Sequence, residues 1–288
     1  MSAFTLPSAS LLAQSVLSGV FVGALYGLMG LGLSLSWGLL RVINLAHFAF
    51  AFLAAYLCYQ LASMGIDPLL SLAIIVPLFF ALGAGLQTLV ARFAITPFNS
   101  LLLTFGLTGI VEAVIQSIWS ADFRKLESSY AQEKFKVGAL FLPVPELITL
   151  VLAVTISLAV WAVLRYSDVG RALRAAAEDA PIAAAFGVNQ KANALLLAGT
   201  CTAIASIAGV CLALSFTLAP SQIYAWIGVV FAAVMLGGLG RALGPIVAGT
   251  LIGVSEAVTM AVTAPSWAPI VSFTLLIVVL VLKPGRAS

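Results

Sequence analysis

The length, composition and charge of the chain restrict it to one class of protein. Of its 288 residues, 8% are charged, with a formal net charge of +3, and 62% are hydrophobic. A soluble domain carries about 25% charged residues, and a disordered chain is poor in hydrophobic residues. Both classes are excluded, and the composition predicts an all-α polytopic membrane protein.

Apolar stretches, most of them close to the length of about 20 residues that a bilayer requires, follow one another along the chain. The first half contains Leu11–Leu35, Val42–Met64, Leu69–Ala91, Phe98–Ala121 and Leu147–Leu164. The second half contains Ala192–Leu218, Gln222–Leu239, Leu243–Ala264 and Trp267–Leu282. We expect about nine transmembrane helices, or eight if one glycine-rich segment only dips into the bilayer. Residues 1–288 are expected to form a single transmembrane domain.

The distribution of Lys and Arg predicts an orientation, because loops on the cytoplasmic side carry an excess of these residues. With nine spans and a cytoplasmic C-terminus, nine of the 13 basic residues lie inside and four lie outside. The four outside residues fall in residues 122–145, which we expect to form an external loop that need not be well ordered. Residues 167–190 are expected to be cytoplasmic.

Glycines in both halves predict where helices pack or break. Gly19, Gly23 and Gly27 form a stripe that favours close helix packing. The uncharged residues 11–40 would make a helix of about 45 Å, longer than the bilayer core, so we expect a break among the glycines that end with Gly38. Gly237, Gly238 and Gly240 predict a corresponding break in the second half. Paired breaks of this kind are typical of a transport pathway.

Polar residues at membrane depth are candidates for that pathway, since they are costly in contact with lipid. Asn44 is expected to cap a helix that starts within the membrane, and it lies three residues before His47. Equally, both side chains could only satisfy backbone groups at the break. A second set comprises Thr104, Thr108, Glu112 and Gln116 along one helix face, together with Glu256. Two roles are open for the carboxylates of Glu112 and Glu256: they line the pathway, or they join neighbouring helices.

The interval 167–190 predicts two short capped helices. Asp168 is expected to cap a helix through Arg171 and Arg174, and Asp179 a second helix with Pro181 in its first turn. Gly187 is then expected to end the second helix. Such elements favour docking against another protein, and a solvated loop is the alternative.

No enzyme site and no phosphate-binding G-x-x-x-x-G-K-[ST] loop occurs in the sequence. The single histidine and the three scattered cysteines form no catalytic or metal-binding pattern. Any energy from ATP must therefore come from another subunit.

Three segments resemble a known family. Residues 37–47 (WGLLRVINLAH), residues 170–189 (GRALRA followed by AAAFGVN) and residues 236–240 (LGGLG, with Gly244 and Gly249) are similar to motifs of the membrane subunits of branched-chain amino acid ABC importers. Phe48 and Ala49 depart from the small and acidic residues usual after the histidine. That departure leaves urea, short amides and small carboxylates open as substrates.

The resemblance implies a permease subunit in a bacterial-type plasma membrane. It implies a second permease subunit, identical or different, two cytoplasmic ATP-binding subunits and an extracytoplasmic substrate-binding protein, with no cofactor and no nucleic acid. Candidate pathway residues are Asn44, His47, Phe48, Thr108, Glu112 and Glu256, and candidate coupling residues are Arg171, Arg174, Asp179 and Gly187. An ion-coupled secondary transporter is the alternative, and the absence of paired catalytic groups argues against a membrane enzyme.

Overall fold

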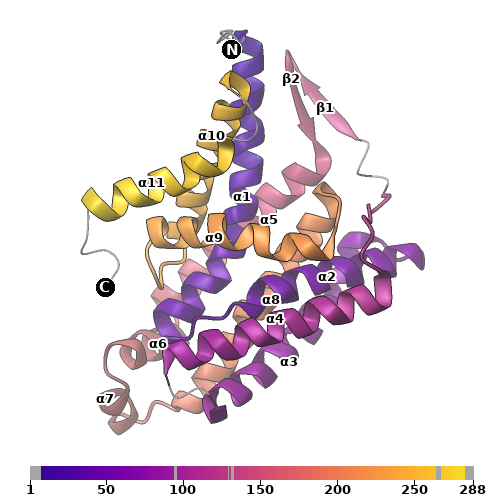
Figure 1. Ribbon diagram of the computed structural model, residues 1–288. Coiled ribbons are helices and arrows are strands. Elements are labelled where there is room, and N and C mark those ends of the chain that lie inside the picture. The colour runs from indigo at the N-terminus through magenta and orange to yellow at the C-terminus, as the bar shows by residue number, and fades with distance from the viewer. Residues whose placement is uncertain (1–7, 94–95, 129, 131–132, 264–266, 283–288) are drawn as a thin grey trace.

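The computed structural model describes residues 8–93, 96–128, 130, 133–263 and 267–282, which form a helical membrane protein (Figure 1). The helices of the first half are α1 (Ala9–Leu40), α2 (Ala46–Ser63), α3 (Pro68–Phe93), α4 (Pro97–Trp119) and α5 (Val144–Tyr166). Two short helices follow, α6 (Asp168–Glu178) and α7 (Ala180–Ala185). The second half contains α8 (Gln190–Ser215), the 3-10 turn η1 (Pro220–Gln222), α9 (Ile223–Gly237), α10 (Gly244–Val262) and α11 (Ala268–Leu282).

Eight helices in the described part of the chain are long and apolar enough to cross a membrane, which confirms the predicted fold class. The ninth predicted span contains α11, of which the structure describes the 15 residues Ala268–Leu282. The choice between eight and nine spans stays a prediction.

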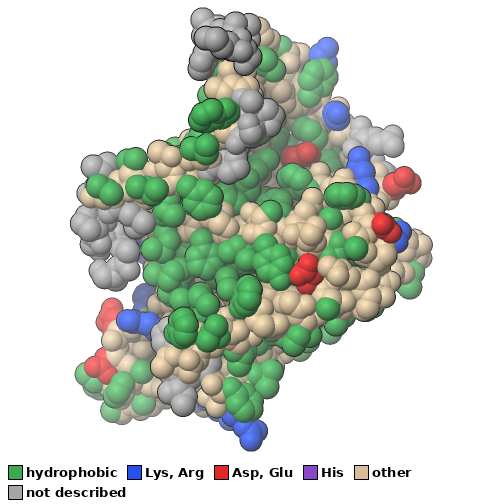
Figure 2. All heavy atoms as spheres, in the orientation of Figure 1, with side chains coloured by type: hydrophobic (Ala, Val, Ile, Leu, Met, Phe, Trp, Pro, Cys, Tyr) green, Lys and Arg blue, Asp and Glu red, His purple; other side chains and the backbone are tan. Residues whose placement is uncertain are grey.

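The helices differ in how much of their surface the chain itself covers. α1, α2 and α8 are the most buried of the eight, and α3, α4 and α5 are the most exposed. Hydrophobic side chains cover the central part of the face in Figure 2, with Lys and Arg side chains toward its upper right and lower ends. Such an apolar band between charged ends is what a lipid-embedded protein requires.

The predicted break inside the first span does not occur, because α1 runs without interruption for 32 residues. Its glycines instead allow close packing: a Cβ on Gly23 would lie 2.5 Å from Thr250 Cα, and one on Gly19 would lie 2.6 Å from Val254 Cα. The stripe formed by Gly19, Gly23 and Gly27 thus packs α1 directly on the backbone of α10. The helix is long because its N-terminal part reaches past the other spans (Figure 1).

The loop between α4 and α5 contains a hairpin that the sequence analysis did not predict. Lys134–Val137 (β1) and Leu140–Pro143 (β2) form an antiparallel hairpin, and Gly138 adopts a positive φ of 62° in its two-residue turn. A glycine at this position is the usual signal of a tight hairpin. The hairpin also contacts α1 through two hydrogen bonds. Gln14 Nε2 donates to Phe141 O (3.0 Å), and Phe141 N donates to Gln14 Oε1 (2.9 Å).

A second contact ties the same loop to the turn between α2 and α3. The Tyr130 hydroxyl donates a hydrogen bond to the Asp67 carboxylate. This bond stabilises the ionised carboxylate and holds the pKa of Asp67 below its ordinary value. It likewise raises the pKa of Tyr130.

Two contacts join loops that are distant in the sequence. At one end, the loop after α4 pairs with the end of α8 through Arg124 N and Leu218 O (2.9 Å). At the other end, Arg41 after α1 donates to Ala177 O in α6 (3.4 Å). Segments that the sequence places on one side of the membrane therefore meet on one side of the fold.

Candidate functional site

The helix breaks lie at the ends of α1 and α9. α1 continues through Gly38 to Leu40, and Arg41 follows in the left-handed conformation with a φ of 59°. α9 ends at Gly237, and Gly238 and Gly240 have φ values of 88° and 72°. Left-handed backbone of this kind favours glycine, so the turn from 238 to 243 depends on these two residues.

The two breaks are in direct contact, and we call this contact the break junction (residues 34–45 and 237–244). Gly240 N donates to Ser34 O (2.9 Å), and Ser34 Oγ donates to Gly238 O (3.2 Å). Gly38 is required here because a Cβ on it would overlap Gly240 N. Ser34, which the sequence analysis did not single out, is fully buried and connects α1 with the α9–α10 turn.

Asn44 lies in this junction but does not cap α2. Leu45 occupies the N-cap position, no side chain caps the helix, and Leu45 N donates to Thr104 Oγ1 of α4 (3.0 Å). The Thr104 hydroxyl thus holds the residue before α2, and the predicted cap by Asn44 is absent. Asn44 is buried, and its Oδ1 has no hydrogen-bond partner among the described residues. It borders a cavity of about 10 Å³ beside Ser36 and Gln87, about the space of one water molecule.

His47 and Phe48 are fully enclosed by the chain. His47 Nε2 lies 2.9 Å from Met29 O, and the ring fits against Gly32, where a Cβ would lie 2.5 Å from His47 Cε1. The Phe48 ring stacks on Phe231 of α9 at 6.3 Å between centroids. In this conformation both side chains support helix packing and neither faces an open cavity.

We expect His47→Ala to lower the thermal unfolding temperature of the purified chain. The variant loses a buried hydrogen bond, which contributes about 0.5–1.5 kcal/mol, and leaves a cavity beside Gly32. His47→Gln can keep a contact with Met29 O and should lose less stability. Unchanged stability together with altered substrate affinity would instead place His47 on the transport path.

The polar stripe of α4 (Thr104, Thr108, Glu112 and Gln116) begins at the break junction and continues along the helix. Thr108 is buried and donates to Thr104 O (2.8 Å). Glu112 is half-buried, accepts from Gln116 Nε2 (3.1 Å) and lies beside the Tyr224 hydroxyl of α9. The buried part of the stripe therefore faces α2, Glu112 lies beside the start of α9, and Gln116 is exposed.

Glu256 belongs to a separate cluster that joins three helices. The Tyr26 hydroxyl of α1 donates to Glu256 Oε2 (3.0 Å), and the Ser272 hydroxyl of α11 donates to Glu256 Oε1. Both carboxylate oxygens of Glu256 are thus used for contacts between α1, α10 and α11. Tyr26 and Ser272 were missed in the sequence, although hydroxyl side chains within apolar helices were the available signal.

The candidate pathway residues therefore do not form one site. Thr108 and Glu112 lie on α4, Asn44 borders the small cavity between α1, α3 and α8, and Glu256 joins α1, α10 and α11. The aromatic start of α9 separates Glu112 from Glu256, since Tyr224 lies 6.4 Å from Phe105 and Trp226 lies 5.7 Å from Tyr26 between ring centroids.

The segment from 167 to 190 contains the two expected short helices. Ser167, and not Asp168, caps α6, because Ser167 Oγ accepts from Gly170 N (3.0 Å) while Asp168 pairs with Arg171. Arg174 donates to Leu164 O and so connects α6 with the end of α5.

α7 has the predicted ends and an exposed apolar surface. Asp179 Oδ1 accepts from Ile182 N (3.0 Å), and Gly187 follows the helix with a φ of 87°. Ile182 and Phe186 are 57% and 86% exposed. Figure 1 shows α6 and α7 projecting at the lower left, away from the bundle. An exposed phenylalanine on a projecting capped helix is typical of a docking surface.

Comparisons with known proteins agree on one family. Residues 15–280 match the permease components of branched-chain amino acid transport systems. The chain is 28% identical to LivH of Salmonella typhimurium over 94% of this chain and 93% of that protein, and 26% identical to LivH of Escherichia coli over the same shares. It is 25% identical to BraD of Pseudomonas aeruginosa over 94% of each chain. All three are described as high-affinity branched-chain amino acid transport system permease proteins. No solved structure gives a significant match.

Proposed function

The chain belongs to the family of permease components of branched-chain amino acid transport systems, and we propose from this that residues 1–288 act as one permease domain of an ATP-driven importer. By family it is a transport component and not an enzyme. The proposed energy source is a pair of separate cytoplasmic ATP-binding subunits, since the sequence contains no phosphate-binding loop of its own.

The observation that carries this proposal is the projection formed by α6 and α7. Its base is held to the bundle by Arg174 and Arg41, which donate to backbone carbonyls of α5 and α6. Its tip exposes Ile182 and Phe186. A rigid base with an apolar tip can transmit a movement of a bound ATPase to α1 and α5, and through α1 to the break junction.

We propose that the path runs beside Asn44, Thr108 and Glu112, with His47, Phe48 and Glu256 as the residues that support its walls. Asn44 has a buried oxygen without a hydrogen-bond partner among the described residues, and Glu112 on α4 is half-buried. Gln116 accompanies Glu112 on the exposed side. A second permease subunit, identical or related, would complete the path.

Branched-chain amino acids are the proposed substrates, since the relatives LivH and BraD carry that description. The departure at Phe48 weighs little against them because its ring is buried against Phe231 and does not narrow an open cavity. Urea, short amides and small carboxylates remain the alternative substrates. A soluble binding protein on the outer side would deliver the substrate.

Reconstitution into proteoliposomes tests the energy source. The chain, its partner permease, the ATPase subunits and the binding protein should together import leucine only when ATP is present on the ATPase side. Imposed proton and sodium gradients provide the control. Uptake driven by either gradient without ATPase subunits would contradict the proposal and favour a secondary transporter.

Cysteine labelling tests the proposed orientation, with α6, α7 and the C-terminus in the cytoplasm. The native residues Cys58, Cys201 and Cys211 are all buried, so background labelling should be low. A cysteine at Glu178 should react with a membrane-impermeant maleimide only after the membrane is opened, and one at Phe123 in intact cells. The reverse pattern would exclude ATPase docking at α7.

A further inference from the structure

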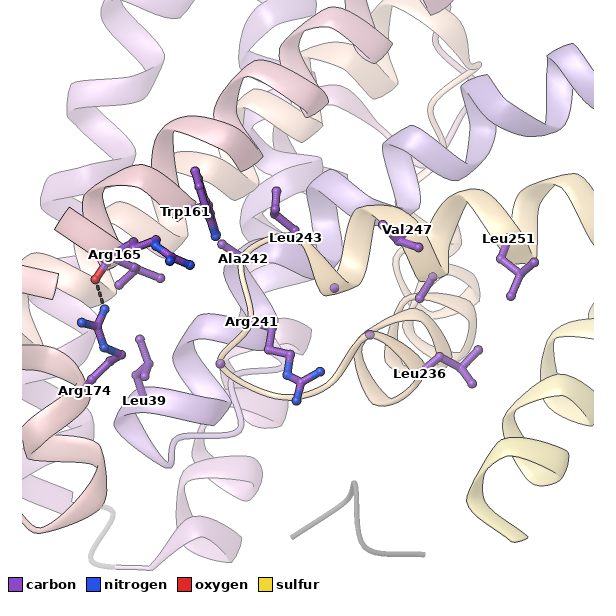
Figure 3. Close-up of a pocket in the computed structure, with 15 residues that line it drawn as sticks. Leu39, Trp161, Arg165, Arg174, Leu236, Arg241, Ala242, Leu243, Val247 and Leu251 are labelled. Carbon is purple, nitrogen blue, oxygen red and sulfur yellow. Dashed lines mark hydrogen bonds between the residues drawn. The ribbon is translucent and has the colours of Figure 1, made fainter. Parts of the chain in front are cut away.

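A large pocket opens beside the break junction, between the end of α5, α6 and the α9–α10 turn. Its volume is about 800 Å³, within the range of ligand pockets. Figure 3 shows Arg165 and Arg174 at its left side, Arg241 on the turn in the middle, and Leu236, Val247 and Leu251 to the right.

The charged side of the pocket is entirely basic. Among the described residues, Arg165, Arg174 and Arg241 line it and no Asp or Glu does. In the described part of the chain none of the three forms an ion pair, since the one pair found there joins Arg171 and Asp168. Three guanidinium groups around one hollow attract an anion, and guanidinium geometry suits phosphate oxygens.

The guanidinium groups are held in place by contacts that leave donors free. Arg165 lies 5.6 Å from the centroid of the Trp161 ring and 5.8 Å from that of Tyr166. Arg174 uses one nitrogen for Leu164 O. The Arg241 side chain lies against Gly238, where a Cβ would approach Arg241 Cδ to 3.2 Å.

The other side of the pocket is an apolar strip on α10. Val247 and Leu251 are four residues apart, on one helix face, and are 68% and 55% exposed. The strip leads from the charged end of the pocket along a helix that spans the membrane. A free anion would make no contact with this apolar strip. A lipid can place its headgroup at the basic side of the pocket and an acyl chain on the strip.

We propose that this pocket binds an anionic glycerophospholipid, with its phosphate at Arg165, Arg174 and Arg241 and an acyl chain along Val247 and Leu251. Basic pockets between helices at the cytoplasmic side are typical sites for anionic headgroups. The lipid would connect α6, which carries Arg174, with the α9–α10 turn, which carries Arg241. The inference rests on the proposed function in one respect: that function places α6 and the α9–α10 turn at the inner leaflet.

Native mass spectrometry of the complex purified through this chain, after removal of bound lipid, tests the proposal. Titration with phosphatidylglycerol should give one saturable adduct per copy of the chain, at lower concentration than phosphatidylcholine. Arg165→Gln and Arg241→Gln should each weaken phosphatidylglycerol binding about fivefold, the effect of one basic residue near an anionic headgroup. Arg92→Gln removes a charge at the end of α3, outside the pocket, and should leave binding unchanged.

The outcomes separate the alternatives. Equal retention of the two lipids, or unchanged binding in both pocket variants, would overturn the proposal. Displacement of the lipid by millimolar inorganic phosphate would also overturn it and indicate a site for soluble anions. Absence of the adduct from the complex would overturn it as well and indicate that another subunit covers the pocket. ATP-driven uptake by the same complex tests the proposed function independently, so a failure of lipid selectivity alone removes only this inference.

Discussion

Replacement of Phe186 by aspartate is expected to abolish substrate-stimulated ATP hydrolysis while the chain remains folded and inserted. Phe186 is 86% exposed at the end of α7, so its loss removes little packing within the chain. If the ring anchors the ATPase, its truncation costs about 2 kcal/mol or more of binding, and a carboxylate adds a desolvation cost. ATP hydrolysis by the reconstituted complex, with and without substrate and binding protein, measures the effect.

Matched variants make this expectation specific to the docking surface. Phe186→Ala should reduce co-elution of the ATPase subunit on size exclusion, and Ile182→Ala should reduce it less. Phe93→Ala removes a similarly exposed ring from the end of α3 and should leave coupling intact. Wild-type coupling in Phe186→Asp would show that the ATPase docks elsewhere.

The position of Gly187 explains why the ring is presented in this way. Gly187 follows α7 with a φ of 87°, and its N–H donates to Ala184 O (2.9 Å). This closes the helix and directs the chain back toward α8. A proline, whose φ is fixed near −65°, cannot adopt that conformation, so Gly187→Pro should misplace Phe186 and disturb coupling in the same assay.

The predictions that held depend on short-range signals. Apolar length identifies the spans, and the Asp179–Pro181 pair and Gly187 identify the ends of α7, because capping and left-handed backbone involve only neighbouring residues. The glycine stripe of α1 likewise identifies a packing face. It does not identify the partner, because α10 lies more than two hundred residues away in the sequence.

The predictions that failed concern competition between neighbouring or distant groups. Asn44 was expected to cap α2, but Thr104 on α4 supplies the acceptor for Leu45 N. Ser167 and Asp168 are both good caps, and pairing with Arg171 leaves the role to Ser167. The residue preferences of the local sequence predict neither the contact at the start of α2 nor the cap of α6.

The break in α1 was inferred from length and glycine content, and both features have another use in the structure. Extra length is accommodated at the N-terminal end of α1, where Gln14 binds the hairpin. Gly32 provides space for the His47 ring, and Gly38 provides space for Gly240. The actual interruption begins at Arg41, just beyond the last of these contacts.

The packing of α1 on α10 leads to the second large effect, for Gly23→Ala. A Cβ on Gly23 would lie 2.5 Å from both Gly249 O and Thr250 Cα. These are backbone atoms that cannot rotate away, so the helices must separate. Overpacking of this kind costs about 1–3 kcal/mol, and we expect a lower unfolding temperature and less chain in the membrane.

Gly85→Ala provides a control with the opposite expected sign. Gly85 lies on the exposed side of α3, and no heavy atom lies within 4 Å of a Cβ placed there. Alanine should then stabilise α3 by about 0.5–1 kcal/mol through its higher helix propensity. Thermal unfolding of both variants in the same detergent compares the two directly.

A double variant distinguishes a clash between α1 and α10 from a general intolerance of α1 to alanine. Gly249→Ala should be as harmful as Gly23→Ala, since a Cβ there would lie 2.6 Å from Gly23 O. Once either substitution has separated the helices, the second should cost less, so the combined loss should be smaller than the sum. Additive losses would mean that the two glycines act independently. The close backbone contact, which positions Tyr26 against Glu256 and α1 against the α9–α10 turn, would then not exist in the folded protein.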